Sequence, residues 1–145
     1  MRIAIIIVAF SSLLFGSGCL SETHPVGVSR SQEINSDHVL NAPPNEAKSL
    51  EDGAGVFVIR DSGMMGFAAS LKFFIDGTPV ALLDPYERYV AYIPEGEHIF
   101  GVLPQPKFGA EVHETTVILR KGKMYHFRAS VDFGGAKIQP TAFVQ

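Results

Sequence analysis

The stretch "SLKFFIDGTPVALL" (residues 70–83) decides the fold class of this chain of 145 residues. Leu71, Phe73 and Ile75 alternate with other side chains, which is the pattern of a strand with one buried face. Asp76-Gly77 suits the two central positions of a tight hairpin turn, because both positions require a positive φ. The stretch therefore predicts two antiparallel strands joined by a two-residue turn.

The second strand of this hairpin carries a proline. Pro79 has no backbone N–H and cannot donate a hydrogen bond to a neighbouring strand. We therefore expect the strand over residues 78–83 to lie at the edge of a sheet or at a bulge.

Further short apolar runs, separated by turn residues at spacings of about ten, are typical of an all-β protein. Within one of them, Tyr125, Phe127, Ala129 and Val131 alternate and are expected to face the core. The predicted strands cover residues 56–60, 70–76, 78–83, 88–93, 97–103, 111–119, 124–131 and 137–144. Seven or eight short strands within residues 54–145 predict one domain, a two-layer antiparallel β-sandwich.

Two segments resemble a known pattern. "LKFFIDGTPVALLDPYERYVAYIPEGEHIFGV" (residues 71–102) continues the hairpin into an aromatic strand, a Pro-Glu-Gly turn and another strand. "TTVILRKGKMYHFRAS" (residues 115–130) joins an apolar strand to an aromatic one through Lys-Gly-Lys. Together they resemble an uncharacterised domain family of bacterial lipoproteins, related in pattern to PEGA-type β-sandwich domains. The family more often has Pro-Gly directly where this chain has Pro94-Glu95-Gly96. The resemblance implies a prealbumin-like or immunoglobulin-like sandwich and no reaction.

The N-terminus is predicted to be a signal peptide. Met1-Arg2 supplies one positive charge, and the apolar run over residues 3–15 is shorter than the roughly 20 residues that a membrane-spanning helix needs. Gly16-Ser17-Gly18 then precede Cys19, the only cysteine of the chain. This arrangement resembles the lipobox of bacterial lipoproteins, although the family usually has Leu three residues before the cysteine. The resemblance implies that residues 1–18 are removed and that Cys19 is lipidated.

Lipidation of Cys19 predicts a protein held in the bacterial cell envelope. Two or more acyl chains give a stable membrane anchor. Leu20 stands where an Asp would retain a lipoprotein at the inner membrane, so by resemblance we expect the outer membrane, with the domain facing the periplasm. The alternative is cleavage by an ordinary signal peptidase, which would release a secreted soluble protein with one free thiol.

Residues 19–53 are predicted to form a flexible tether. They are rich in Ser, Asn, Glu and Pro and show no sustained period, and such a coil reaches on the order of 30 Å. His24 and His38 lie in this stretch and are expected to be solvated. Without residues 1–18 the chain has four more acidic than basic side chains. That balance gives no basic surface for nucleic acid.

The sequence holds no strong signature of catalysis. It lacks a Gly-x-Ser-x-Gly motif, and Ser62, next to Asp61, is more simply a turn residue. His98, His113 and His126 fall in predicted strands and could bind zinc or copper, but no two of them have the spacing of paired ligands. We therefore predict no enzyme, no cofactor and no metal site.

Carboxylates and aromatic residues lie near the predicted turns. Asp84 and Glu87 are interpreted as carboxylates that serve turns. Tyr86, Tyr92 and Phe108 are the candidate ligand-binding residues, because aromatic rings at loop ends could stack on a glycan or peptide. Tyr89, in contrast, alternates in phase with two apolar residues of its strand and is assigned to the core.

These patterns predict a non-catalytic, lipid-anchored envelope protein that acts as a protein-binding or structural module. An exposed strand edge would add to a partner's sheet. The alternatives are glycan or small-ligand binding at the tyrosine-bearing end and, last, a metal-binding or enzymatic domain. The basic turn "RKGK" (residues 120–123) could touch anionic lipid, or serve as a soluble turn whose lysines protect the neighbouring strand from aggregation.

Overall fold

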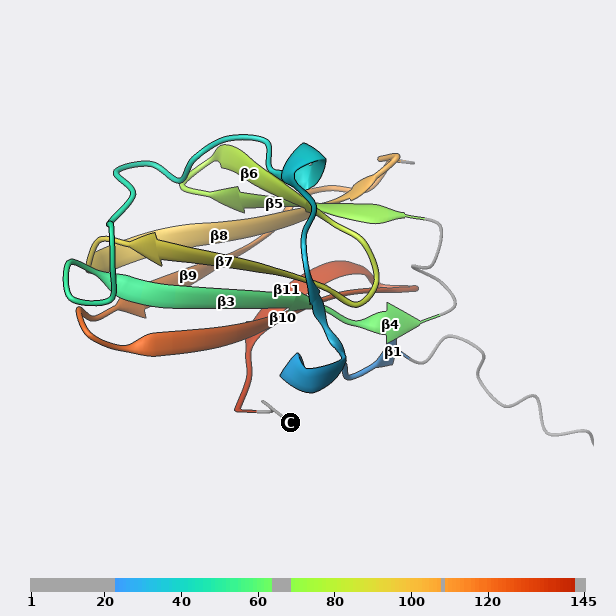
Figure 1. Ribbon diagram of the computed structural model, residues 1–145. Coiled ribbons are helices and arrows are strands. Elements are labelled where there is room, and N and C mark those ends of the chain that lie inside the picture. The colour runs from blue at the N-terminus through green and yellow to red at the C-terminus, as the bar shows by residue number, and fades with distance from the viewer. Residues whose placement is uncertain (1–22, 64–68, 108, 143–145) are drawn as a thin grey trace, which may run out of the picture.

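The structure is a computed structural model that describes residues 23–63, 69–107 and 109–142 (Figure 1). Its strands are β1 (Thr23–His24), β2 (Gln32–Glu33), β3 (Ala54–Arg60), β4 (Ser62–Gly63), β5 (Ser70–Ile75), β6 (Thr78–Leu83), β7 (Glu87–Ile93), β8 (Gly96–Gln105), β9 (His113–Leu119), β10 (Met124–Asp132) and β11 (Gly135–Pro140). Two short 3-10 helices, η1 (Val28–Arg30) and η2 (Ser36–His38), lie among the first strands. No helix in these three ranges is long and apolar enough to cross a membrane. The predicted signal peptide, Cys19 and Phe108 lie outside the described residues.

The protein is a β-sandwich, which confirms the predicted fold class. One sheet has the strand order β11-β10-β3-β7-β2, the other has the order β6-β5-β8-β9, and β1 pairs with β4. β10 runs parallel to β3, and β2 runs parallel to β7. The predicted antiparallel arrangement holds for the other strand pairs.

Aromatic side chains from both sheets fill the centre of the sandwich. Tyr89 and Phe127 of the five-stranded sheet meet Phe73 and Phe100 of the four-stranded sheet, in edge-on contacts with ring centroids 5.0–5.8 Å apart. Each such pair contributes about 0.5–1.5 kcal/mol beyond the area that it buries. All four rings are buried, as alternation predicted for Phe73, Tyr89 and Phe127.

The hairpin of β5 and β6 forms as its sequence predicts. Asp76 and Gly77 both have positive φ, 49° and 77°. β6 is an edge strand, and its register with β5 shifts next to Phe73, so Pro79 lies both at an edge and near a bulge. The last strand is shorter than predicted: β11 ends at Pro140, and residues 143–145 lie outside the described ranges.

Residues 23–53, which we call the N-terminal segment, are packed onto the sandwich, and the prediction of a flexible tether is wrong for them. The N–H of Gln32 donates to the carbonyl of Tyr86 at 2.9 Å, and the N–H of Leu40 donates to the carbonyl of Val80 at 2.9 Å. Several of its residues are buried as well: Val26, Gly27, Ser31, Pro43 and Gly53.

The N-terminal segment covers the sheet edges on one side of the sandwich. β2 pairs with β7 at the edge of the five-stranded sheet, and Val39 bridges to Ala81 of the edge strand β6. In Figure 1 the segment, blue to cyan, runs from the lower sheet to the upper one. An aperiodic polar sequence can do this, because pairing with an edge uses backbone groups rather than an apolar face.

The loops of the sandwich gather at two ends. β1, β4 and the connections β6–β7, β8–β9 and β10–β11 lie at one end, at the right in Figure 1. We call it the proximal end, because Thr23, the first described residue, lies there. The turns β5–β6, β7–β8 and β9–β10 lie at the opposite, distal end.

Candidate functional site

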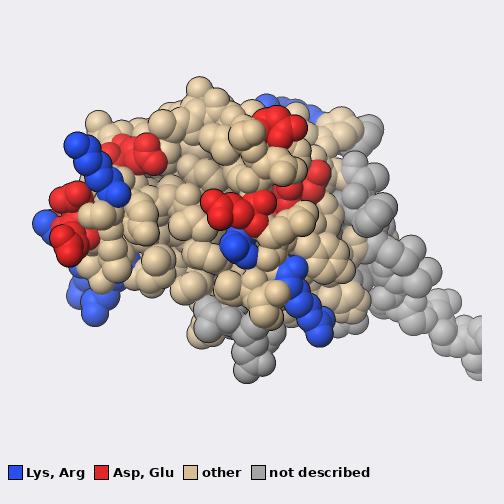
Figure 2. Space-filling view, viewed as in Figure 1, with Lys and Arg blue, Asp and Glu red and all other residues tan. Residues whose placement is uncertain are grey.

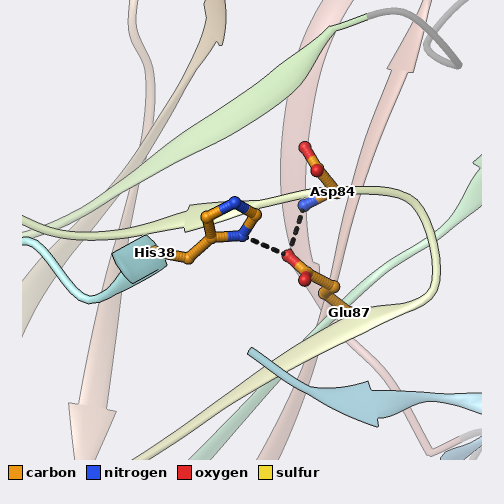
Figure 3. Close-up of side chains that lie close together, drawn as sticks. All are labelled: His38, Asp84 and Glu87. Carbon is orange, nitrogen blue, oxygen red and sulfur yellow. Dashed lines mark hydrogen bonds and ion pairs between the residues drawn. The ribbon is translucent and has the colours of Figure 1, made fainter. Parts of the chain in front are cut away.

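Three potential metal ligands converge where the N-terminal segment meets the connection between β6 and β7 (Figure 3). His38 ends η2, Asp84 follows β6 and Glu87 begins β7. One ligand atom from each residue lies within 4.8 Å of the others. We call these three residues the His38 cluster.

A tight turn brings the two carboxylates of the cluster together. The N–H of Glu87 donates to the carbonyl of Asp84 at 2.9 Å, which closes a four-residue turn. Pro85 sets its second position, and Tyr86 takes a φ of 72° at its third, as in a type II turn. The interpretation of Asp84 and Glu87 as residues that serve a turn is therefore confirmed, but they also bind the N-terminal segment.

Hydrogen bonds connect every member of the cluster. Glu87 Oε2 lies 2.9 Å from His38 Nδ1 and also accepts the N–H of Asp84 at 2.9 Å. Asp84 Oδ1 accepts the hydroxyl of Ser70 at 2.5 Å. The side chain of Glu87 is only 3 % exposed and that of His38 is 23 % exposed. The expectation of a solvated His38 is therefore wrong, and His38 clamps the N-terminal segment onto β7.

The surroundings of the cluster shift the pKa values of His38 and Arg60. The hydrogen bond with Glu87 raises the pKa of His38, helped by the charges of Glu87, Asp84 and Asp37 and opposed by burial. Arg60, at the end of β3, is almost completely buried. Burial lowers the pKa of Arg60 to about 10, against the charges of Asp61 and Asp84. Arg60 therefore remains a cation at neutral pH and partly neutralises Asp84.

The donor set of the cluster matches a zinc site by residue type, since zinc takes imidazole nitrogen and carboxylate oxygen at about 2.0–2.2 Å. However, Nδ1 of His38, Oε2 of Glu87 and Oδ1 of Asp84 already have protein partners. The nearby Arg60 cation also competes with a metal. We therefore interpret the cluster as a hydrogen-bonded clamp. The Ser70 hydroxyl faces a carboxylate, so the cluster also lacks the serine–histidine contact of a hydrolase.

A second contact fixes the N-terminal segment at the proximal end. The carboxylate of Asp61 accepts the N–H of Val26 at 3.1 Å and two bonds from the guanidinium of Arg128, at 3.0 Å from Nε and 2.6 Å from Nη2. Arg88 adds a bond of 2.6 Å to the carbonyl of Ser31. The sequence predicts Asp61 only as part of a turn with Ser62 and gives no signal of its contacts with Val26 and Arg128.

The predicted aromatic platform of Tyr86 and Phe108 stays a prediction, and Tyr92 does not belong to it. Tyr86 is 45 % exposed at the proximal end, whereas Tyr92 lies near the other end of β7. Six residues of strand separate them by about 20 Å. Phe108 lies outside the described residues. Tyr86 and Tyr92 therefore cannot stack on one small ligand.

The three strand histidines lie apart. His98 bridges two distal turns, with Nδ1 2.7 Å from an Asp76 carboxylate oxygen and Nε2 2.9 Å from the carbonyl of Pro94. His113 accepts the N–H of Ile138 at 3.4 Å. His126 is on β10, with its ring 5.3 Å from that of Phe57. None of them belongs to the cluster of potential metal ligands that the described residues contain.

An open hollow of about 510 Å³ lies at the proximal end, between the β8–β9 loop and the β10–β11 hairpin. Residues 109–113 and 133–136 line it. Phe133, at the tip of the hairpin, is 75 % exposed, the highest value among the large exposed hydrophobic residues described. Phe133 is not among the predicted site residues, although a lone aromatic residue between Asp132 and two glycines is a signal of an exposed turn.

β9 offers the longest uncovered edge of the sandwich. It pairs with β8 on one side, and no described residue pairs with its other side. Its exposed residues are His113, Glu114, Thr116 and Ile118, the last 66 % exposed. The edge of β11 is shorter, ends in Pro140 and has the N–H of Ile138 bonded to His113.

Comparisons with known proteins add no relative: no protein-family model, no curated protein and no solved structure matches the chain. The resemblances to a lipobox and to PEGA-type domains stay predictions.

Proposed function

We propose that the protein is a non-catalytic module of the bacterial envelope, anchored by lipid on Cys19, that binds a partner protein by strand addition to β9. The binding mode is supported by a difference between the strands at the sheet edges. The N-terminal segment covers β7 and β6, while no described strand pairs with the outer side of β9.

The composition of β9 supports strand addition. Its central residues, Thr115 to Ile118, are all β-branched, and the strand has no proline or glycine. Such residues favour the extended backbone that an added strand requires. An uncovered edge of this kind presents unpaired N–H and C=O groups to another chain.

The lipid anchor is tested by intact mass. Protein extracted from membranes of its native host should begin at Cys19 and carry an increment of several acyl chains. An unmodified chain that begins at Cys19 would instead support a secreted soluble protein and contradict the anchor.

Strand addition is tested by two neighbouring proline variants, Thr115→Pro and Thr116→Pro. Successive N–H groups of a strand point to opposite sides, so one of these residues donates to β8 and the other points to the free edge. The variant that keeps the melting temperature of the wild type should lose the envelope proteins that the wild type captures from detergent extracts. Unchanged capture by this variant would contradict the proposed binding mode.

Hydrogen exchange supplies the direct readout. Amides of β9 should become protected when the captured partner is added back, whereas those of β10 should not change. Protection confined to other surfaces would place the partner elsewhere.

A further inference from the structure

The N-terminal exit of the chain lies at the proximal end. β1 contains Thr23, pairs with β4 and contacts β10. If Cys19 carries the lipid, as the proposed function holds, Thr23 lies four positions after the lipidated residue. A fully extended chain of that length spans at most about 14 Å. The packed N-terminal segment therefore brings the proximal end close to the bilayer, well within the reach expected of a flexible tether.

The turns at the two ends differ in chemistry. Each distal turn has an exposed charged residue at its tip: Asp76, Glu95 and Lys121. Of the proximal turns, β6–β7 presents Tyr86 and β10–β11 presents Phe133, with 45 % and 75 % of their surfaces exposed. The β8–β9 loop adds the exposed charges of Lys107 and Glu111. Figure 2 shows charged side chains of both signs at the distal end, at the left, and also over the middle and right of this face.

Phe133 is held outward by its neighbours. The carboxylate of Asp132 accepts the N–H of Gly134 at 2.7 Å and binds the Lys137 ammonium at 2.8 Å. These contacts close the tip of the hairpin beneath Phe133. An exposed aromatic ring at the tip of a closed hairpin suits the boundary between lipid headgroups and acyl chains.

We propose that the proximal end rests on the lipid bilayer that holds the anchor, with Phe133 inserted at the headgroup level and Tyr86 at the same end of the sandwich. This inference depends on the lipid anchor of the proposed function. It also excludes the basic turn 120–123 from contact with the same membrane surface. That turn is distal, and the nine residues of β10 place it about 30 Å away.

The experiment uses the lipidated protein in vesicles of phosphatidylethanolamine with a minority of phosphatidylglycerol. Because Cys19 is the only cysteine and the lipid blocks it, an introduced cysteine is the only reactive thiol. Phe133→Cys and its distal control Lys121→Cys are each labelled with a polarity-sensitive fluorophore. Lipids with a nitroxide on the headgroup should strongly quench the label at position 133, with a blue-shifted emission, and leave position 121 unchanged.

A second pair of labelled proteins differs only in whether Phe133 is present. The label is placed at Lys107→Cys, in the neighbouring proximal loop, with either Phe133 or Phe133→Ser. Quenching at position 107 should fall when Phe133 is replaced. Equal quenching in both proteins would overturn the role of Phe133.

The intact mass of the same preparation separates the two hypotheses. If the chain is lipidated but the label at position 133 is quenched no more than the label at position 121, the inference is overturned and the lipid anchor stands. A chain without lipid on Cys19 contradicts the anchor and overturns the inference with it. Quenching at position 133 that appears only when envelope proteins are added back also overturns it, in favour of a protein partner.

Discussion

Arg128 donates two hydrogen bonds to Oδ2 of Asp61, at 3.0 Å from Nε and 2.6 Å from Nη2, next to the parallel pair of β10 and β3. The side chain of Asp61 is only 2 % exposed and that of Arg128 is 18 % exposed, so little water reaches the pair. Asp61 uses its other oxygen to hold Val26, which makes this pair a support for the whole N-terminal segment.

Replacing Arg128 should therefore strongly destabilise the protein. Arg128→Ala removes the cation that is hydrogen-bonded to a buried carboxylate, which typically costs about 3–5 kcal/mol. The free energy of unfolding in urea measures the loss. The control is Lys137→Ala at the half-exposed pair with Asp132, for which we expect less than about 1 kcal/mol. Equal losses in the two variants would contradict the supporting role of Asp61.

Stability should depend on pH through His38. Its pKa is raised above 6.5 by the hydrogen bond with Glu87, so the protonated form is favoured by folding. The contribution is complete below pH 6.5 and is lost as the pH rises through the folded pKa. Because His38 is partly exposed, we expect less than about 1 kcal/mol.

The measurement is the difference in unfolding free energy between wild type and His38→Gln at two pH values. The difference should be larger near pH 6 than near pH 8.5, with the ordinary pKa of 6.5 between them. The same difference at both values would show that the charge of His38 does not stabilise the fold.

A chelator should leave the protein unchanged if the His38 cluster is a clamp. We expect EDTA to have no effect on the melting temperature. Glu87→Gln should lower the free energy of unfolding by about 1–3 kcal/mol, because the buried hydrogen bonds with His38 and Asp84 lose their ionised acceptor. A drop in melting temperature with EDTA that disappears in Glu87→Gln would show instead that the cluster binds a metal.

Gly53 should tolerate no side chain. A Cβ at this position would lie 2.3 Å from the carbonyl oxygen of Ile93 and 2.7 Å from the Cβ of Ala47, so Gly53→Ala should cost about 1–3 kcal/mol. Gly55→Ala is the matched control, because its Cβ would meet only the flexible end of Met124 at less than 3 Å. Thermal unfolding of both variants tests the difference, and a smaller loss for Gly53→Ala would refute it.

Local patterns explain which parts of the fold were predictable. The turn at Asp76-Gly77 and the inward row of β5 depend on neighbours in sequence, and both formed as predicted. The N-terminal segment depends on single contacts with distant residues: Val26 with Asp61, 35 positions away, and His38 with Glu87, 49 positions away. The periodic pattern of apolar residues in the sequence does not indicate such contacts.

A signal for the His38 cluster was nevertheless present. Glu87 alternates in phase with Tyr89, Ala91 and Ile93 of β7, so its side chain points toward the interior. A buried carboxylate requires hydrogen-bond partners. The phase of the strand could therefore have indicated that Glu87 binds something, although not that the partner is His38.

The packing of the N-terminal segment also fixes an order of events in folding. Its residues are synthesised first, yet their backbone partners lie in and next to β6 and β7, which are synthesised later. Contacts of this separation form only after a long loop has closed, which is slow. Residues made before β6 and β7 therefore find their place only after these strands are present, and until then the edges of β6 and β7 are open to other chains.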